Sequence, residues 1–312
     1  MNLQRLMEQY ITFQRSLGMP FVTDAIALRA FGRAMGARAV VAKVRPRHVE
    51  AFLGKTAPVT VTWHTKFSRL RSFFKYAVSR GYIAVAPLPS VIPKRPPPFV
   101  PYIFSREELR RLLDVAESNP RSVRLEPVTI QTLLLLLYGA GLRLREAVDL
   151  RRADVDLSGF VLTIRNTKFG KTRLVPIGPQ LNNVLAEYAA RVKSRARQAD
   201  GPFFTSRTGT PVKPDTLQRN FRIYCDQVGI RRTDGAREQP RIHDLRHTFA
   251  VHRLTSWYRQ GADVQRLLNQ LSVYLGHVHL RHTQVYLSMT PELLNEANKR
   301  FENYARKEQV HD

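Results

Sequence analysis

The sequence predicts a mainly α-helical (α+β) protein, with a small helical N-terminal domain and a larger, mostly helical domain that carries a small β-sheet or hairpin. Three observations indicate this fold class. The 312 residues suffice for two domains. Seven prolines occupy fifteen positions in residues 87–101 and interrupt the chain. On both sides of this segment, apolar residues recur mostly at the spacing of helices rather than with the alternation of strands.

The first 86 residues are predicted to form a helical domain. Two segments have apolar residues at helical spacing: Leu3, Leu6, Met7, Tyr10 and Phe13, then Phe67, Leu70, Phe73, Phe74 and Ala77. The second segment is interleaved with the basic residues Lys66, Arg69, Arg71, Lys75 and Arg80. A helix with an aromatic inner stripe and a basic outer face suits contact with the DNA backbone, so these five side chains are the predicted DNA-binding residues. The alternative is a basic face that is only solvated.

Residues 87–103 are expected to be an extended, stiff linker, because proline fixes the backbone and removes a hydrogen-bond donor. Beyond the linker, the sequence Ser105-Arg-Glu-Glu108 is a capping box that predicts the start of a helix. The apolar residues 128–138 predict the next helix, which Gly139-Ala-Gly141 ends. A further helix is expected from about residue 143 to residue 150.

Two short segments, residues 160–164 and 172–175, are predicted to pair as a β-hairpin around a turn at 167–170. Helices are expected to follow at residues 178–197, 214–228, 242–259, 262–274 and 291–306. The predicted boundaries are therefore 1–86 for the first domain, 87–103 for the linker, 104–290 for the second domain and 291–312 for a C-terminal helix and tail.

The charge of the chain points to a polyanionic partner. Lysine and arginine number 50 against 25 acidic residues, a net charge of +25, and such a surplus repels itself unless phosphates neutralise it. DNA is the first candidate and an anionic membrane surface the second. The longest apolar stretch, residues 133–137, is far shorter than the roughly 20 residues of a membrane span. With no visible signal peptide and the single cysteine Cys225, the sequence predicts a cytoplasmic protein.

Three segments of the second domain carry groups that can bind or attack a phosphate. The segment GAGLRLREAVDL places Arg143 and Glu146 three residues apart, where the carboxylate can orient the guanidinium. The segment IHDLRHTFAVH has His243 and Arg246 at the same spacing. In YLGHVHLRHTQVYLSM, Tyr286 follows His277 by nine residues. For the first two segments, an ordinary surface ion pair and a polar helix face or core histidine are the alternatives.

The third segment also allows a metal-site interpretation, because it contains His277, His279 and His282. No carboxylate or cysteine lies at ligand spacing beside them, and the neighbouring arginines oppose a bound cation. The sequence therefore favours no metal and no cofactor. It also has no glycine-rich loop of the kind that holds a nucleotide phosphate.

In this order and at these separations, the segments resemble the tyrosine recombinase (phage integrase, XerC/XerD-like) family. LRSFFKYAVSRGYIAVAP is similar to the end of the family's helical core-binding (SAM-like) domain. GLR-xxE, HDLRHTFA and LGH with its tyrosine are similar to the family's catalytic motifs. The resemblance covers nearly the whole chain. Arg145, His279 and a long spacer before LGH depart from the pattern, which affects expected loop geometry more than chemistry.

The resemblance implies the catalytic set Arg143, Lys168, His243, Arg246, His277 and Tyr286, with Glu146 in support. The two arginines would grip the phosphate, the tyrosine would attack it, and His243 would serve as the base. His277 would hydrogen-bond the phosphate. A lysine of the hairpin, Lys168 with Lys171 as its competitor, would protonate the leaving 5′ oxygen. The product would be a 3′-phosphotyrosine and a free 5′ hydroxyl, rejoined to another strand without ATP or metal.

The implied function is site-specific DNA recombination or integration. The implied partners are double-stranded DNA and further copies of the chain, four on two DNA sites, while a second recombinase is left open. The C-terminal helix would dock on a neighbouring protomer, or pack on its own domain. The long spacer and the segment before HDLRH favour a mobile-element enzyme. The alternatives are a type IB topoisomerase, a non-catalytic DNA-binding accessory protein and a histidine-rich metallohydrolase.

Overall fold

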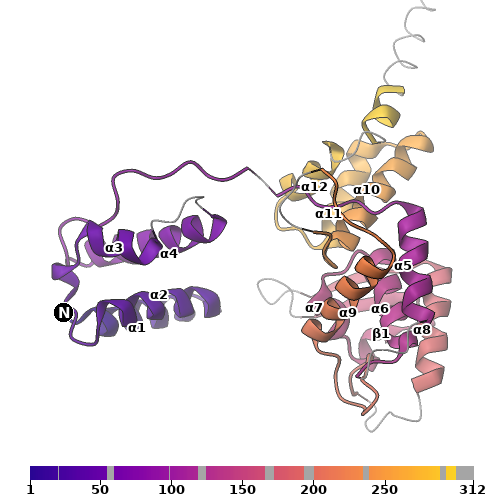
Figure 1. Cartoon of the computed structure of the whole chain (residues 1–312), viewed down its shortest axis with the longest axis horizontal. Helices are drawn as coiled ribbons and strands as arrows, with labels where there is room; N and C mark the ends of the chain where they lie inside the picture. The colour runs from indigo at the N-terminus through magenta and orange to yellow at the C-terminus, as the bar shows by residue number, and fades with distance from the viewer. Residues whose placement is uncertain are drawn as a thin grey trace, which may run out of the picture. The chain divides into compact units, whose positions relative to one another are not determined.

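The computed structural model describes residues 1–19, 21–54, 60–97, 99–118, 124–165, 172–192, 200–234, 239–288 and 293–299. The chain divides into two compact units, Met1–Phe99 and Val100–Asp312. Both units are mainly helical, and the described part contains one small sheet, in the second unit (Figure 1). The predicted fold class is thereby confirmed.

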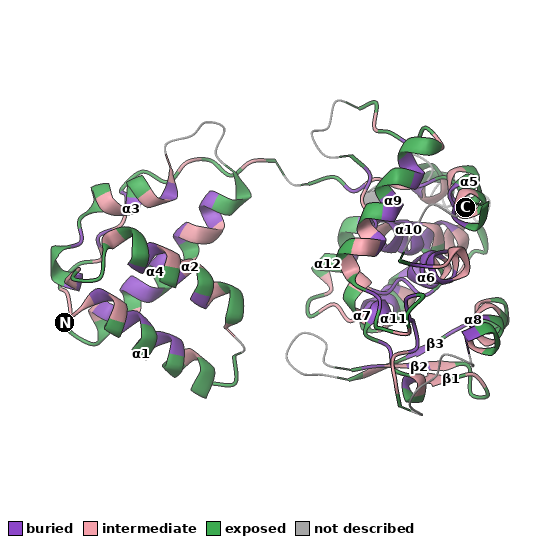
Figure 2. Ribbon diagram, turned by 60° about the horizontal axis from the view of Figure 1, so that its bottom comes forward, coloured by how far each residue is buried: buried purple, intermediate pink, exposed green. Residues whose placement is uncertain are grey.

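The first unit is a helical bundle. It consists of α1 (Leu3–Ser16), α2 (Val22–Met35), a 3₁₀ turn η1 (Val41–Lys43), α3 (Pro46–Leu53) and α4 (Val61–Ser79). The helices pack because each turns an apolar stripe towards the others (Figure 2). The apolar residues predicted on α4 are all buried. Phe13 of α1 differs from expectation, because it is 37% exposed and stacks on Tyr76.

The proline-rich segment has neither helix nor strand at residues 83–97 and 99–105. Its first residues nevertheless belong to the first unit, since Pro87 and Pro89 are buried and Leu88 packs against the helical core. The division between the two compact units falls after Phe99, which lies inside the predicted linker.

The second unit is built around α6. Its helices are α5 (Arg106–Ser118), α6 (Pro127–Gly139), α7 (Leu144–Val148), α8 (Pro179–Val192), α9 (Pro214–Gln227), α10 (Asp244–Arg259), α11 (Val264–Leu275) and α12 (Arg281–Gln284). Helix α6 is apolar on several sides and contacts α5, α8 and α10. The capping box at the start of α5 forms as predicted, because the Ser105 and Glu108 side chains each accept the other's backbone N–H, at 3.1 and 2.8 Å.

The sheet has three antiparallel strands in the order β1 (Val155–Asp156), β2 (Val161–Ile164) and β3 (Arg173–Pro176), preceded by a 3₁₀ turn η2 (Arg152–Asp154). The predicted hairpin is β2–β3, with the buried pair Leu162 and Val175 in register. Strand β1 was not predicted, because a two-residue strand shows no alternation. The turn predicted at residues 167–170 lies outside the described residues.

The end of the second unit brings the last segments against α10. The long spacer before LGH consists of the end of α10, a turn at Gly261 and α11. A 3₁₀ turn η4 (Val285–Ser288) follows α12, and residues 293–299 are helical. Tyr286 and Leu293 join the apolar core between α10 and α11. In the described part of the chain, no helix has the length and apolarity to span a membrane.

Candidate active site

The site begins at the turn after α6. Arg143 is the N-cap residue of α7, and its backbone N–H donates to Oε2 of Glu146 at 2.9 Å. Its guanidinium donates to Oε1 of the same carboxylate at 2.7 Å and to the carbonyl of Gly276 at 3.1 Å. The predicted pairing of Arg143 with Glu146 is therefore present, and it connects the start of α7 to the end of α11.

Glu146 lies among three arginines. Arg173 of β3 donates two hydrogen bonds to its carboxylate, at 2.9 and 2.8 Å, and Nη1 of Arg246 lies 3.9 Å from Oε2. The Glu146 side chain is only 8% exposed. Burial alone would raise its pKa, but the hydrogen bonds from Arg173 and Arg143 lower the pKa to about 2. Glu146 is therefore a fixed anion that sets the positions of the cations around it.

Arg246 is a buried cation that joins two distant loops. It is 2% exposed and donates to the carbonyl of Gly141 at 2.8 Å and to that of Leu275 at 2.6 Å. Burial and the charge of Arg143 lower its pKa to about 10, so the guanidinium stays charged at neutral pH. Its position fixes the loop before α7 against the end of α11.

Gly141 has a backbone conformation and a close contact that only glycine allows. Its φ is +59°, and a Cβ would lie 2.4 Å from Cδ1 of the buried Phe249. We expect Gly141→Ala to lower the free energy of unfolding by about 2–4 kcal/mol, because strain and overpacking add. Gly178→Ala is the matched control, since a Cβ there meets nothing within 4 Å, and it should change stability by less than about 0.5 kcal/mol. Urea unfolding measures both; equal stabilities would contradict the prediction.

Tyr286 reaches this cluster from η4. It is 2% exposed, and its hydroxyl lies 3.1 Å from Nδ1 of His247. The ring of His277 lies nearly parallel to the Tyr286 ring, with centres 6.1 Å apart, and Nδ1 of His277 is 2.7 Å from Oγ1 of Thr283. Burial raises the pKa of Tyr286, and the charge and hydrogen bond of Arg246 offset only part of this effect. The phenol is therefore protonated at neutral pH.

Two half-buried histidines of the site are neutral at neutral pH. Burial, followed by the charge of Arg246, lowers the pKa of His277 to about 3. Burial and the neighbouring His243 lower the pKa of His247 to about 3. A neutral imidazole can accept a proton or a hydrogen bond, which an imidazolium cannot.

These pKa values predict that acid destabilises the protein in a defined pH range. Because His247 and His277 titrate near 6.5 when unfolded but at about 3 when folded, protons bind the unfolded chain first. Stability should begin to fall as the pH drops below about 7.5 and go on falling until about pH 3. We expect the melting temperature to decrease from about pH 7.5 to 5.5, where most carboxylates are still ionised, and to decrease less steeply in His277→Gln. A melting temperature that is constant over this range would contradict the assignment.

The profile of the Phage integrase family matches residues 103–292, which span the whole of this cluster. The chain belongs to the phage integrase family. It is a tyrosine-type site-specific DNA recombinase, and the predicted family and enzyme class are confirmed.

Relatives of this integrase-family chain agree with the assignment. The integrase/recombinase protein y4rB of Sinorhizobium fredii is 41% identical over 247 residues, which cover 77% of this chain and 78% of the relative. The tyrosine recombinase XerC of Staphylococcus saprophyticus is 30% identical over 244 residues, which cover 78% and 76% of the two chains.

Solved integrases share the fold. The Tn1549 transposon integrase in complex with transposon right end DNA has a TM-score of 0.69 at 16% identity, covering 98% of this chain and 100% of that chain. A lambda integrase tetramer bound to a Holliday junction has a TM-score of 0.64 at 16% identity, covering 89% of this chain and 78% of that chain.

Most of the predicted site residues of this family member meet in one place. The structure brings together Arg143, Glu146, Arg246, His277 and Tyr286, with His243 at the start of α10. The predicted Lys168 and its competitor Lys171 lie outside the described residues. Two neighbours were missed, Arg173 and His247. Arg173 gave no signal, because its partner Glu146 lies 27 residues earlier. His247 did have a signal in the sequence, because it lies inside the HDLRHTFA motif directly after Arg246.

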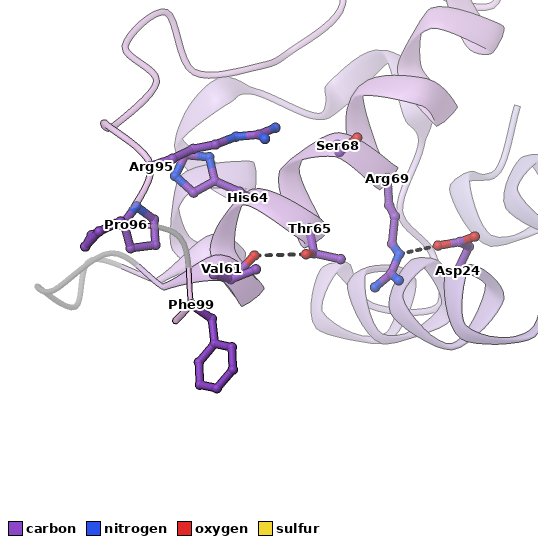
Figure 3. A pocket seen from close by; sticks show the side chains of 10 residues that line it. Asp24, Val61, His64, Thr65, Ser68, Arg69, Arg95, Pro96 and Phe99 are labelled. Carbon is purple, nitrogen blue, oxygen red and sulfur yellow. Dashed lines mark hydrogen bonds and ion pairs between the residues drawn. The ribbon is translucent and has the colours of Figure 1, made fainter. Parts of the chain in front are cut away.

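The predicted DNA-binding residues of the first unit lie in different surroundings. Arg71, Lys75 and Arg80 are exposed. Lys66 is half-buried, with its ammonium 5.0 Å from the centre of the Phe52 ring. Arg69 forms an ion pair with Asp24 of α2 beside a pocket of about 550 Å³ (Figure 3). The predicted basic face is thus partly neutralised at Arg69 by Asp24.

The metal-site alternative, which the sequence disfavours, concerns the three histidines after α11. Their rings are neighbours, with His282 centred 6.1 Å from His277 and 5.7 Å from His279. Within the described ranges, no group of three or more histidine, cysteine or acidic side chains is arranged to hold a metal ion.

Proposed function

We propose that Tyr286 is the nucleophile with which this recombinase cleaves DNA. The observation that carries the proposal is the position of its hydroxyl beside His247 and Arg246, in a cluster that also holds Arg143. In the proposed step, the phenolic oxygen forms a bond to the phosphorus and the bond to the 5′ oxygen breaks. The resulting phosphotyrosine ester retains the energy of the broken ester, so a 5′ hydroxyl can rejoin the strand without ATP.

The two arginines would stabilise the charge that develops on the phosphate. Arg143 is 35% exposed, so its guanidinium can meet DNA from outside, and Glu146 holds it in place. Arg246 supplies the second, buried cation. Paired guanidinium donors fit two phosphate oxygens, and a preorganised cation needs no rearrangement when charge develops.

The remaining predicted groups complete the reaction. His277 would donate a hydrogen bond to a phosphate oxygen through Nε2, since its Nδ1 contacts Thr283. Lys168, which is predicted to lie in the hairpin, would protonate the leaving 5′ oxygen. His243, at the exposed start of α10, would lie close to the DNA. No step needs a metal or another cofactor.

A suicide substrate tests this assignment. The substrate is a pool of DNA duplexes of different sequence, each with a nick in one strand. When cleavage occurs close to the nick, the short fragment that carries the new 5′ hydroxyl dissociates. Religation then fails, and the covalent complex accumulates. We expect a complex in which the DNA is attached to Tyr286, and sequencing the trapped DNA would identify the target site. Tyr286→Phe should bind the same DNA without forming the complex. A complex that persists in Tyr286→Phe, or attachment to another residue, would overturn the proposal.

The basic first unit would hold the DNA near the site. Arg71, Lys75 and Arg80 are exposed on or directly after α4, and phosphate contacts from such residues supply affinity without base specificity. We assign the core-binding role to residues 1–86, the linker to 87–103 and the catalytic role to 104–290. Strand exchange would require four protomers on two DNA sites, as in the lambda integrase tetramer bound to a Holliday junction.

The compartment and the biological role of the enzyme are proposed separately from its activity. We propose that the enzyme acts in the cytoplasm, where the single buried Cys225 stays reduced. We also propose that it serves a mobile element. The long α10–α11 segment and the fold shared with the Tn1549 transposon integrase support this role.

A further inference from the structure

The hydroxyl of Tyr286 contacts a histidine that the predicted catalytic set does not contain. Oη of Tyr286 lies 3.1 Å from Nδ1 of His247, and the two ring centres are 5.6 Å apart. His247 directly follows Arg246 in the first turn of α10. The helix that places the buried phosphate-binding arginine therefore also places this imidazole on the phenolic oxygen.

The direction of the proton in this contact follows from the surroundings. The groups that face His247 are His243, Arg246, Arg241, His277 and Tyr286, and burial with this set keeps the His247 imidazole neutral. The buried phenol of Tyr286 is protonated. The hydroxyl therefore donates to Nδ1, and the proton of the ring is on Nε2. A lone pair aimed at the proton of a nucleophile is the arrangement that general-base catalysis requires.

The other two histidines of the site are less suited to this task. The ring of His277 presents its face to Tyr286, with 30° between the planes, and its Nδ1 contacts Thr283. The ring of His243 lies perpendicular to that of His247, 5.0 Å away. Among the hydrogen bonds of the described residues, the one between Tyr286 and a histidine has Nδ1 of His247 as its acceptor.

We propose that His247, in place of the predicted His243, is the catalytic base of the recombinase, which takes the hydroxyl proton of Tyr286 as its oxygen attacks the DNA phosphorus. The inference rests on the proposed function, in which Tyr286 is the nucleophile. The Oη–P bond forms, the P–O5′ bond breaks, the phenolic proton moves to Nδ1 of His247, and the 5′ oxygen takes a proton from the predicted acid Lys168. In religation the 5′ hydroxyl attacks the phosphorus and returns its proton to Lys168, while the Oη–P bond breaks and the imidazolium returns its proton to Tyr286.

The bound substrate favours this proton transfer. In the free protein, the arginines around His247 oppose an imidazolium. A DNA phosphate held by Arg143 and Arg246 adds negative charge next to the ring, and a nearby anion stabilises the charged form of histidine. The base would thus gain strength only when the scissile phosphate is in place.

The test compares His247→Ala and His247→Gln with the wild type in single-turnover cleavage of the suicide duplex. At neutral pH we expect both variants to form the Tyr286 adduct roughly 10²–10⁴-fold more slowly, with unchanged DNA affinity. Glutamine can accept a hydrogen bond but cannot take the proton, so it should not restore the rate. The deficit should shrink only in alkaline solution above about pH 10, the ordinary pKa of a phenol, because burial raises the pKa of Tyr286. His252→Gln, on the same helix and bonded to Tyr138, should cleave at the wild-type rate.

The outcomes separate this inference from the proposed function. Cleavage by His247→Ala at the wild-type rate would overturn the inference. Full activity in His247→Gln, or a deficit that is the same at every pH, would show that His247 only positions the tyrosine and would also overturn it. If the alanine variant does not fold, the glutamine variant and its pH profile decide the question. A wild-type protein that forms no adduct at Tyr286 would instead overturn the proposed function.

Discussion

Replacing Glu146 with alanine is expected to lower the free energy of unfolding of the second unit by roughly 3–5 kcal/mol. The reason is the charge that remains. Glu146 is 8% exposed and receives bidentate hydrogen bonds from Arg173, which is 11% exposed, while Arg246 beside it is 2% exposed. Without the carboxylate, these buried guanidiniums would face one another and Arg143 with no counter-charge.

Urea unfolding of the full chain measures this effect, with fluorescence and circular dichroism used to separate the transitions of the two units. Glu107→Ala is the matched control, because Glu107 pairs with Arg110 at 2.7 Å while their side chains are 62% and 70% exposed. We expect the control to change stability by less than about 0.5 kcal/mol. A loss below about 1 kcal/mol in Glu146→Ala would show that the three arginines do not depend on this carboxylate.

Replacing Arg246 with lysine is expected to slow formation of the covalent DNA complex by roughly 10²–10³-fold. Lysine keeps the positive charge, but it lacks the planar fork that donates to the carbonyls of Gly141 and Leu275. The loop before α7 and the end of α11 would lose their common anchor, and the phosphate would lose a paired donor.

The measurement is the single-turnover rate on a suicide duplex, with DNA affinity determined in parallel. Arg145→Lys serves as the control, because Arg145 lies on α7 with its side chain 77% exposed, and its rate should stay at the wild-type value. Cleavage by Arg246→Lys at the wild-type rate would mean that charge alone suffices and that the fork geometry has no role.

The sequence predicted most helices because their signals are local. The capping box at Ser105 and Glu108 needs four neighbouring residues, and the apolar residues of α6 lie next to one another. The strand β1 was missed for the opposite reason, since its two residues carry no pattern of their own and depend on pairing with β2.

The site was predictable only in part. Six of its members came from motifs whose spacing and order are themselves informative, whereas Arg173 shows its role only through a partner far away in the sequence. The same holds for Asp24, which lies outside the site on α2 of the first unit. Arg173 binds Glu146 across 27 residues, and Asp24 neutralises Arg69 across 45. A helix face identifies which side chains can meet DNA, but it does not show which of them already have a partner within the fold.

The position of Arg246 between Gly141 and Leu275 makes assembly of the site depend on segments that are synthesised late. Its two carbonyl partners lie 134 residues apart along the chain, and Tyr286 comes later still. A chain that ends before residue 275 lacks one of the two carbonyls that hold Arg246, and a chain that ends before residue 286 also lacks the proposed nucleophile. We therefore expect such truncated chains not to form the covalent DNA complex.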